Sequence, residues 1–209
     1  MSVRSTVPKI AVVGPGLIGK DHISRIINSP LCDLHSIICP EGQSGGKGPL
    51  SEFPWFSSIE ACLNEHPLPD GVIIASPTEF HAAQMVVCVD SSIPCLVEKP
   101  ICSQSSELEA WLEGGRSLRN VLVGHHRHHS AATRVAKQWL DNQKIGSVRT
   151  VVATAQYNKP TSYFKEKPWR TSPSSGGPLL INAIHDIGLM HLLIGPIKRV
   201  MAMGRESSL

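Results

Sequence analysis

The chain has 209 residues, of which 41% are hydrophobic and 18% are charged, a composition typical of a folded globular protein rather than a disordered one. The net charge of +3 does not favour nucleic acid as a partner, because no basic stripe with interleaved aromatic residues accompanies it. The apolar runs have the length of strands, and the N-terminal stretch MSVRSTVPKI contains no apolar segment of a signal peptide. We therefore expect no membrane span and no secretion.

Six cysteines are present, and no two of them form a CxxC pair. This spacing favours neither a zinc site nor a thioredoxin-like motif. We expect reduced, mostly buried thiols in a cytoplasmic protein.

The first predicted element is the stretch KIAVVGPGLIGKDH, in which an apolar strand runs into three glycines and then into an amphipathic helix over 17–27. This order is the one that a dinucleotide fingerprint requires. Gly14 would make the tight turn, Gly16 would let the backbone approach a pyrophosphate, and Gly19 would let helix and strand pack closely. The phosphates would lie on the free amides of the helix N-terminus. A purely structural turn is the alternative.

Strands and helices alternate along the next hundred residues, which predicts a parallel sheet with helices on both faces. The expected strands cover 34–39, 71–76, 94–99 and 120–125, and the expected helices cover 57–66, 79–90 and 105–118. Serines are expected to cap the first and third of these helices. Residues 40–49 are rich in glycine and indicate a surface loop.

A second region begins near Gly124, so we predict two domains, over 1–124 and 125–209. Its expected elements are a helix over 131–143, a strand over 147–157, a long loop over 158–177, a helix over 178–195 and a strand over 197–204. Loops of this length inside a domain are often functional.

Polar groups follow three of the expected strands, at Ser76, at Lys99 and at the HHRHH cluster of residues 125–129. Ligands of doubly wound sheets bind beyond the carboxyl ends of the strands, so these groups predict one cleft. In such a place Lys99 can hydrogen-bond a substrate oxygen or move its proton, whereas an isolated lysine is ordinarily a surface residue.

The histidine cluster does not predict a metal site, because alternation along a strand would send neighbouring side chains to opposite faces and no nearby carboxylate or cysteine completes a ligand set. Within it, Arg127 is the better candidate, as a clamp for an anion or a hydroxyl, and a solvated loop is the alternative. On the last helix Asn182 and His185 are three residues apart and would share one face. His185 is a candidate general acid–base, or else a satisfied core histidine.

Taken together, the motifs GPGLIGKDH, ASPTEFHAA, VEKPIC, VGHHRHH and GGPLLINAIHDIGLMHLLIG resemble the Gfo/Idh/MocA oxidoreductase family, over residues 8 to about 203. The resemblance implies a Rossmann domain that binds NAD or NADP, followed by an incomplete α/β open-sheet domain. It implies hydride transfer between nicotinamide and a hydroxyl or carbonyl group of a small substrate, often a sugar or polyol. Lys99 matches the lysine of the family's EKP motif, and His185 matches its catalytic histidine.

The site residues that we expect fall into three overlapping groups. Expected catalytic residues are Lys99, His185 and Asn182. Expected cofactor-binding residues are Gly14, Pro15, Gly16, Leu17, Ile18, Gly19, Cys39, Ser76, Pro77, Thr78, His81, Glu98, Lys99 and Arg127. Expected substrate-binding residues are Lys99, Arg127, Tyr163, Trp169, Arg170, Asn182 and His185, with charge contributed by Lys159.

The sequence departs from the family pattern in three ways. Ile181 stands where an aspartate usually precedes the histidine by four residues, which removes a partner that would orient the imidazole. Cys39 stands where an acidic residue usually holds the adenosine ribose, so the choice between NAD and NADP is open, although Glu41 follows two residues later. The chain is also short for the family, which leaves a truncation, a natural short form, or a homo-oligomer that supplies the missing strands through the C-terminal sheet.

Two further functions stay open beside an NAD(P)-dependent oxidoreductase. The same groups could catalyse a non-redox reaction, such as isomerisation, elimination or cyclisation. The chain could also bind nucleotide without any catalysis.

Overall fold

The computed structural model describes residues 7–42, 49–65, 67–156, 158–165 and 179–204. The chain divides into two compact units. The first unit contains residues 1–124 and 160–181, and the second contains residues 125–159 and 182–209. The predicted division into two domains at residue 124 stays a prediction.

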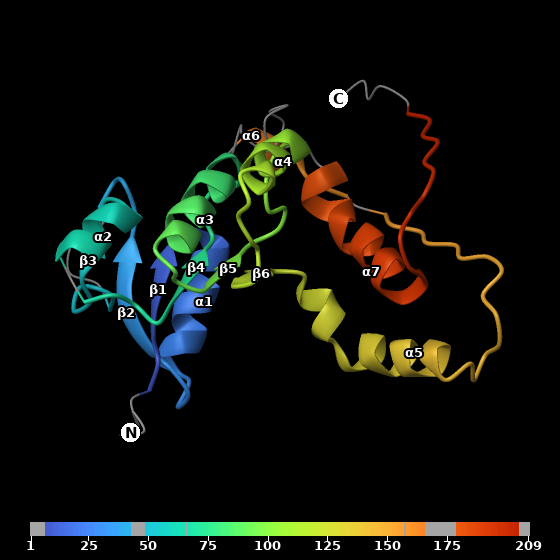
Figure 1. Cartoon of the computed structure of the whole chain (residues 1–209), viewed down its shortest axis with the longest axis horizontal. Coiled ribbons are helices and arrows are strands. Elements are labelled where there is room, and N and C mark those ends of the chain that lie inside the picture. The colour runs from blue at the N-terminus through green and yellow to red at the C-terminus, as the bar shows by residue number, and fades with distance from the viewer. Residues whose placement is uncertain (1–6, 43–48, 66, 157, 166–178, 205–209) are drawn as a thin grey trace. The chain divides into compact units, whose positions relative to one another are not determined.

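In the described part of the first unit, six strands form one sheet in the order β3-β2-β1-β4-β5-β6, and every neighbouring pair is parallel (Figure 1). The strands are β1 (Lys9–Val13), β2 (Asp33–Ile38), β3 (Trp55–Phe56), β4 (Gly71–Ile74), β5 (Cys95–Val97) and β6 (Val121–Val123). This is the strand order of a Rossmann domain, so the predicted fold class is confirmed. The short edge strand β3 was not predicted, because two residues carry no periodicity.

The helices of this unit are α1 (Leu17–Ile27), α2 (Ile59–Glu65), the 3-10 turn η1 (Thr78–Phe80), α3 (His81–Asp90), α4 (Ser105–Glu113) and α6 (Thr161–Lys165). They cover both faces of the sheet. Val12 of β1 packs in one cluster with Ile23 of α1, whereas its neighbour Val13 packs in another with Met85 of α3. Successive residues of β1 therefore point into two separate cores, as a doubly wound sheet requires.

Serine capping is confirmed for one helix and wrong for another. Ser58 accepts a hydrogen bond from the backbone N–H of Ala61 and caps α2. At α4 the cap is Gln104, which forms a reciprocal capping box with Glu107, and Ser105 is already the first helical residue. Glutamine is not a usual cap, so the sequence favoured the adjacent serine.

The second unit contains the 3-10 turn η2 (His126–His129), helix α5 (Ala131–Asp141) and helix α7 (Ile184–Ile194). A π-helical turn, η5 (Leu179–Ala183), precedes α7. The strands expected over 147–157 and 197–204 are not formed in the described residues. An alternating sequence becomes a strand only when a neighbouring strand pairs with its backbone, and the described part of this unit provides none.

Among the helices that the structure describes, none has both the length and the apolar character needed to cross a bilayer.

Candidate active site

The turn between β1 and α1 is shaped by glycines at two positions where a side chain would not fit. Gly14 has φ +80°, and a Cβ there would lie 2.6 Å from the backbone N of Ser76. A Cβ on Gly19 would lie 2.0 Å from the carbonyl O of Gly14. A Cβ on Gly16, in contrast, would meet no atom of the described residues within 4 Å. The tight turn at Gly14 and the close packing at Gly19 are therefore observed, whereas the approach of a pyrophosphate to the open surface at Gly16 stays a prediction.

Helix α1 begins directly after this turn, and its first turn consists of Leu17, Ile18, Gly19 and Lys20. The N–H groups at a helix start lack partners within the helix, so they attract anions. Leu17 and Ile18 are exposed. The open backbone at Gly16 is thus available to a phosphate group, although the contacts of Pro15, Gly16, Leu17 and Ile18 with a cofactor stay predictions.

The segment after β4 is fixed by side chains that bond within the fold. Ser76 Oγ donates to Gln84 Oε1 at 2.6 Å, and Thr78 is buried. The buried His81 ring lies between two carbonyl oxygens, with Nε2 2.8 Å from Ser76 O and Nδ1 2.8 Å from Pro100 O. His81 therefore joins the segment after β4 to the segment after β5. Direct contacts of the expected residues Ser76, Pro77, Thr78 and His81 with a cofactor stay predictions.

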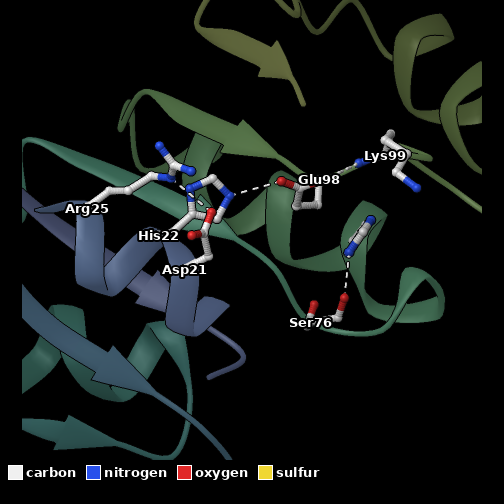
Figure 2. A network of polar contacts seen from close by, with 7 residues as sticks. Asp21, His22, Arg25, Ser76, Glu98 and Lys99 are labelled. Atoms are coloured by element: carbon white, nitrogen blue, oxygen red, sulfur yellow. Dashed lines mark hydrogen bonds and ion pairs between the residues drawn. The ribbon is translucent and has the colours of Figure 1, made fainter. Parts of the chain in front are cut away.

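A polar network links α1 to the segment after β5, as Figure 2 shows. His22 Nε2 lies 2.9 Å from Glu98 Oε1, and Glu98 Oε2 accepts from the backbone N–H of Lys99 at 3.3 Å. Burial by itself would raise the pKa of Glu98, but the His22 hydrogen bond and charge, together with the Lys99 backbone and charge, hold this pKa below its ordinary value. The charged Glu98 therefore connects α1 to the segment that carries Lys99.

Gly124 packs closely against this carboxylate, because a Cβ there would lie only 3.0 Å from Glu98 Oε2. Lys99 itself stands at the carboxyl end of β5, and its Nζ donates to the backbone O of Ile181 at 2.6 Å. Ile181 is the position where the family pattern places an aspartate. In this chain the lysine thus contacts the main chain of that residue.

In the second unit, Asn182 and His185 do not lie on one continuous α-helix. Asn182 belongs to the π-helical turn η5, and His185 is the second residue of α7. The argument that residues three apart share a face holds for α-helical geometry and does not carry across this wider turn. His185 is buried, and its ring packs at an angle of 64° against the ring of His126, with 4.5 Å between the centroids.

The HHRHH cluster forms the turn η2 rather than a strand, so the alternation expected for it is wrong. The rings of His125 and His128 stack with centroids 4.8 Å apart, and Gly188 of α7 faces both, since a Cβ there would lie 3.0 Å from His128 Nε2. Within the described residues, no group of three or more His, Cys, Asp or Glu side chains is placed to hold a metal ion.

Arg127 forms an ion pair with a residue of α7. Its Nη1 donates to Asp186 Oδ1 at 2.6 Å, which ties η2 to the start of that helix. The expected clamping of an anion or hydroxyl by Arg127 stays a prediction.

The residues expected on the long loop are only partly described. Tyr163 lies on α6, with its ring edge-on to Phe164 at 5.2 Å between centroids, and Lys159 is partly exposed. Trp169 and Arg170 lie outside the described residues.

Comparison with known proteins decides the family. Residues 8–126 match the family model described as "Oxidoreductase family, NAD-binding Rossmann fold", and residues 133–208 match the "GFO/IDH/MocA C-terminal domain". The chain belongs to the Gfo/Idh/MocA oxidoreductase family. The resemblance stated from the sequence motifs is thereby confirmed.

Curated family relatives are named dehydrogenases. Inositol 2-dehydrogenase 2 of Saccharopolyspora erythraea is 31% identical over 143 residues, which cover 66% of this chain and 42% of that protein. The 4-carboxy-2-hydroxymuconate-6-semialdehyde dehydrogenase of Sphingobium is 24% identical and covers 93% of this chain and 62% of that protein. The chain spans about half the length of the curated relatives it matches.

Solved structures of the Gfo/Idh/MocA type share the fold. The WlbA dehydrogenase of Bordetella pertussis, solved with NADH and UDP-GlcNAcA, has a TM-score of 0.77 at 21% identity and covers 91% of this chain and 59% of that chain. The scyllo-inositol dehydrogenase of Lactobacillus casei, solved with NAD(H) and scyllo-inositol, has a TM-score of 0.68 at 23% identity, over 91% of this chain and 57% of that chain.

The Rossmann unit of this family member fits a dinucleotide. Side chains at Gly14 and Gly19 would collide with the backbone of the turn, whereas the position of a Cβ on Gly16 is open. This combination lets a pyrophosphate approach the start of α1.

Three polar partners were missed by the sequence reasoning. Gln84 accepts a hydrogen bond from the Ser76 hydroxyl, and Asp186 accepts one from Arg127. His22 pairs with Glu98 across 76 residues of sequence. His22 directly follows the fingerprint on α1, and that position was the one signal available. Pairings of this separation depend on the sheet order, which a single sequence does not state.

Proposed function

We propose that the protein is an NAD-dependent oxidoreductase that acts on a hydroxyl or carbonyl group of a polyol or sugar-like substrate. The observation that carries the proposal is the glycine turn, where Gly14 and Gly19 exclude side chains and leave the backbone at Gly16 open. Membership of an NAD-binding oxidoreductase family supports it. The names of the inositol dehydrogenases among the relatives support the class of substrate.

In this proposal the turn of residues 14–19 binds the pyrophosphate, and the bound nicotinamide supplies or accepts the hydride. Lys99 holds the substrate oxygen by donating from Nζ, and His185 moves the proton of the reacting hydroxyl. Asn182 contributes a further hydrogen bond. The matches of Lys99 and His185 to the family motifs support these roles, as does the place of Lys99 at the carboxyl end of β5.

The test is an assay of the purified chain with NAD⁺ and either myo-inositol or scyllo-inositol, followed by the absorbance of reduced nicotinamide. We expect turnover with at least one member of a polyol and sugar panel. Lys99→Ala should abolish turnover, whereas Lys144→Ala, which removes an exposed charge elsewhere, should leave turnover unchanged. A folded chain that does not bind NADH would refute the proposal.

A non-redox reaction at the same groups is the second candidate. The apolar Ile181 favours it, because this position cannot supply the carboxylate that in the family pattern orients the imidazole for proton abstraction from a hydroxyl. The two functions differ in one readout, since a non-redox enzyme converts substrate without any net change in reduced nicotinamide.

We further propose that the protein is cytoplasmic and forms a homo-oligomer through the segments 147–157 and 197–204. All six cysteines fall in the described residues and are free thiols, which supports a reducing compartment. Large apolar side chains of the second unit are exposed, among them Val152, Val200, Met201 and Met203, which supports burial against another chain.

A further inference from the structure

The end of β2 carries a side-chain pair that the family pattern does not contain. Cys39 follows the last residue of the strand, and its backbone N–H donates to Phe56 O at 2.9 Å. The chain then turns, because Gly42 N–H donates back to Cys39 O at 2.9 Å. Inside this turn, Cys39 Sγ donates to Glu41 Oε2 at 2.9 Å. The thiol therefore fixes one oxygen of the carboxylate.

The Cys39 thiol is suited to act as a donor. It is 8% exposed, and burial first, followed by the hydrogen bond to Glu41, raises its pKa. The thiol consequently stays protonated at neutral pH and keeps its hydrogen for Glu41. A carboxylate has about four acceptor positions on its two oxygens, which suits it to the two neighbouring hydroxyls of a diol.

The pair lies beside the glycine turn. The backbone N–H of Gly14 donates to Ile38 O at 2.9 Å, and Ile38 directly precedes Cys39. In Rossmann domains the adenosine ribose lies at the end of β2, and its acidic partner follows the third glycine by about 20 residues. Cys39 occupies that position relative to Gly19, and Glu41 stands two residues further on.

We propose that Glu41, oriented by Cys39, accepts hydrogen bonds from the adenosine ribose of NAD and disfavours NADP. The inference rests on the proposed function, because it assumes that the glycine turn binds the dinucleotide. The 2′-phosphate of NADP would bring nearly two negative charges next to the carboxylate and remove a ribose hydroxyl that it can bind. Like charges that face each other across a binding interface oppose binding.

The test is calorimetric titration of the full chain with NADH and with NADPH. The wild-type chain should bind NADH at least about tenfold more tightly than NADPH. Glu41→Gln should weaken NADH binding and strengthen NADPH binding, so that the ratio falls several-fold. Glu113→Gln, an exposed charge at the end of α4, is the matched control and should leave the ratio unchanged.

The role of the thiol is tested by two substitutions at Cys39. Cys39→Ser keeps a hydrogen-bond donor and should keep the wild-type ratio, whereas Cys39→Ala removes the donor and should weaken NADH binding. Equal ratios for the Ser and Ala variants would overturn the positioning role of the thiol. Circular dichroism checks folding, and Glu41→Gln keeps the proposal testable where a Cys39 variant misfolds.

The outcomes separate this inference from the proposed function. A chain that binds NADPH as tightly as NADH overturns the role of Glu41 and leaves the oxidoreductase proposal standing. A folded chain that binds neither nucleotide overturns both.

Discussion

At the scale of single residues, Gly16 and Gly19 of the glycine turn should differ in how strongly substitution by alanine destabilises the fold. A Cβ on Gly19 would lie 2.0 Å from the carbonyl O of Gly14, and that atom is backbone that cannot rotate away. Gly19→Ala should therefore lower the free energy of unfolding by roughly 1–3 kcal/mol or more, as overpacking of a core does. Urea denaturation measures this loss.

Gly16→Ala is the matched control, because its Cβ would enter open space. It should unfold at nearly the same urea concentration as the wild type but bind NADH more weakly, since the methyl group would stand where the pyrophosphate approaches. Equal destabilisation by the two substitutions would contradict this account of the turn.

The Glu98 carboxylate makes stability depend on pH. Its pKa in the folded protein lies below its ordinary value, which is about 4.3 in an unfolded chain. A depressed pKa adds stability that is fully present above the unfolded pKa and is lost as the pH falls through the folded one. Glu98→Gln should thus destabilise the protein near neutral pH, by about 1–3 kcal/mol for a hydrogen bond to a charged group.

The difference between wild type and Glu98→Gln should begin to shrink as the pH falls below the unfolded value of about 4.3, and it should vanish once the pH has passed the lower pKa of Glu98 in the folded protein. Urea unfolding at several pH values measures it, with Glu113→Gln as the control for removing an exposed carboxylate. A difference that stayed constant down to acid pH would show that His22 and Lys99 do not stabilise the charge of Glu98.

At the scale of elements, the sequence predicts the cap of helix α2 correctly and the cap of helix α4 wrongly. Ser58 caps α2 by accepting from Ala61 N–H, whereas Ser105 lies inside α4 behind its cap Gln104. Ser58→Ala should cost about 1 kcal/mol of stability. Ser105→Ala should cost almost nothing, because alanine is a better helix former than serine. The shift in thermal midpoint distinguishes the two, and a larger loss at Ser105 would contradict the assignment of the cap.

Elements with local signals were predicted well, and elements that depend on distant partners were not. The five longer strands and the helices between them follow from apolar periodicity, and glycine spacing predicted the turn at Gly14. The sequence predicts the alternation of a strand at His126–His129, but β6 ends at Val123 and a 3-10 turn follows. Its histidines pack on α7 through Gly188, a contact between residues about sixty positions apart that periodicity cannot indicate.

The candidate site divides in the same way. The positions of Gly14 and Lys99 could be assigned to strand ends from sequence, because parallel sheets place those ends at one edge. The partners that fix these residues could not be assigned. The hydrogen bond from Lys99 to a backbone oxygen is an example. Every residue carries such an acceptor, so the sequence does not indicate which one the lysine binds.

At the scale of the whole molecule, the two units differ in how much apolar surface they leave exposed. The sheet of the first unit buries apolar residues on both faces. In the second unit the alternating segments 147–156 and 197–204 form no strand in the described residues, and Val200, Met201 and Met203 are more than 80% exposed. Exposed apolar side chains gathered on such segments favour association with another chain.

We therefore expect the purified chain to have a solution mass of at least twice its 22.6 kDa when measured by light scattering after gel filtration. The double substitution Val200→Ser and Met203→Ser should shift the protein toward monomer, because it removes apolar contacts on one segment. Leu31→Ser is the matched control, since Leu31 is 77% exposed in the first unit and should leave the mass unchanged. A wild-type chain that is monomeric at every concentration, and that binds NADH in that state, would show that these segments are not an interface between copies.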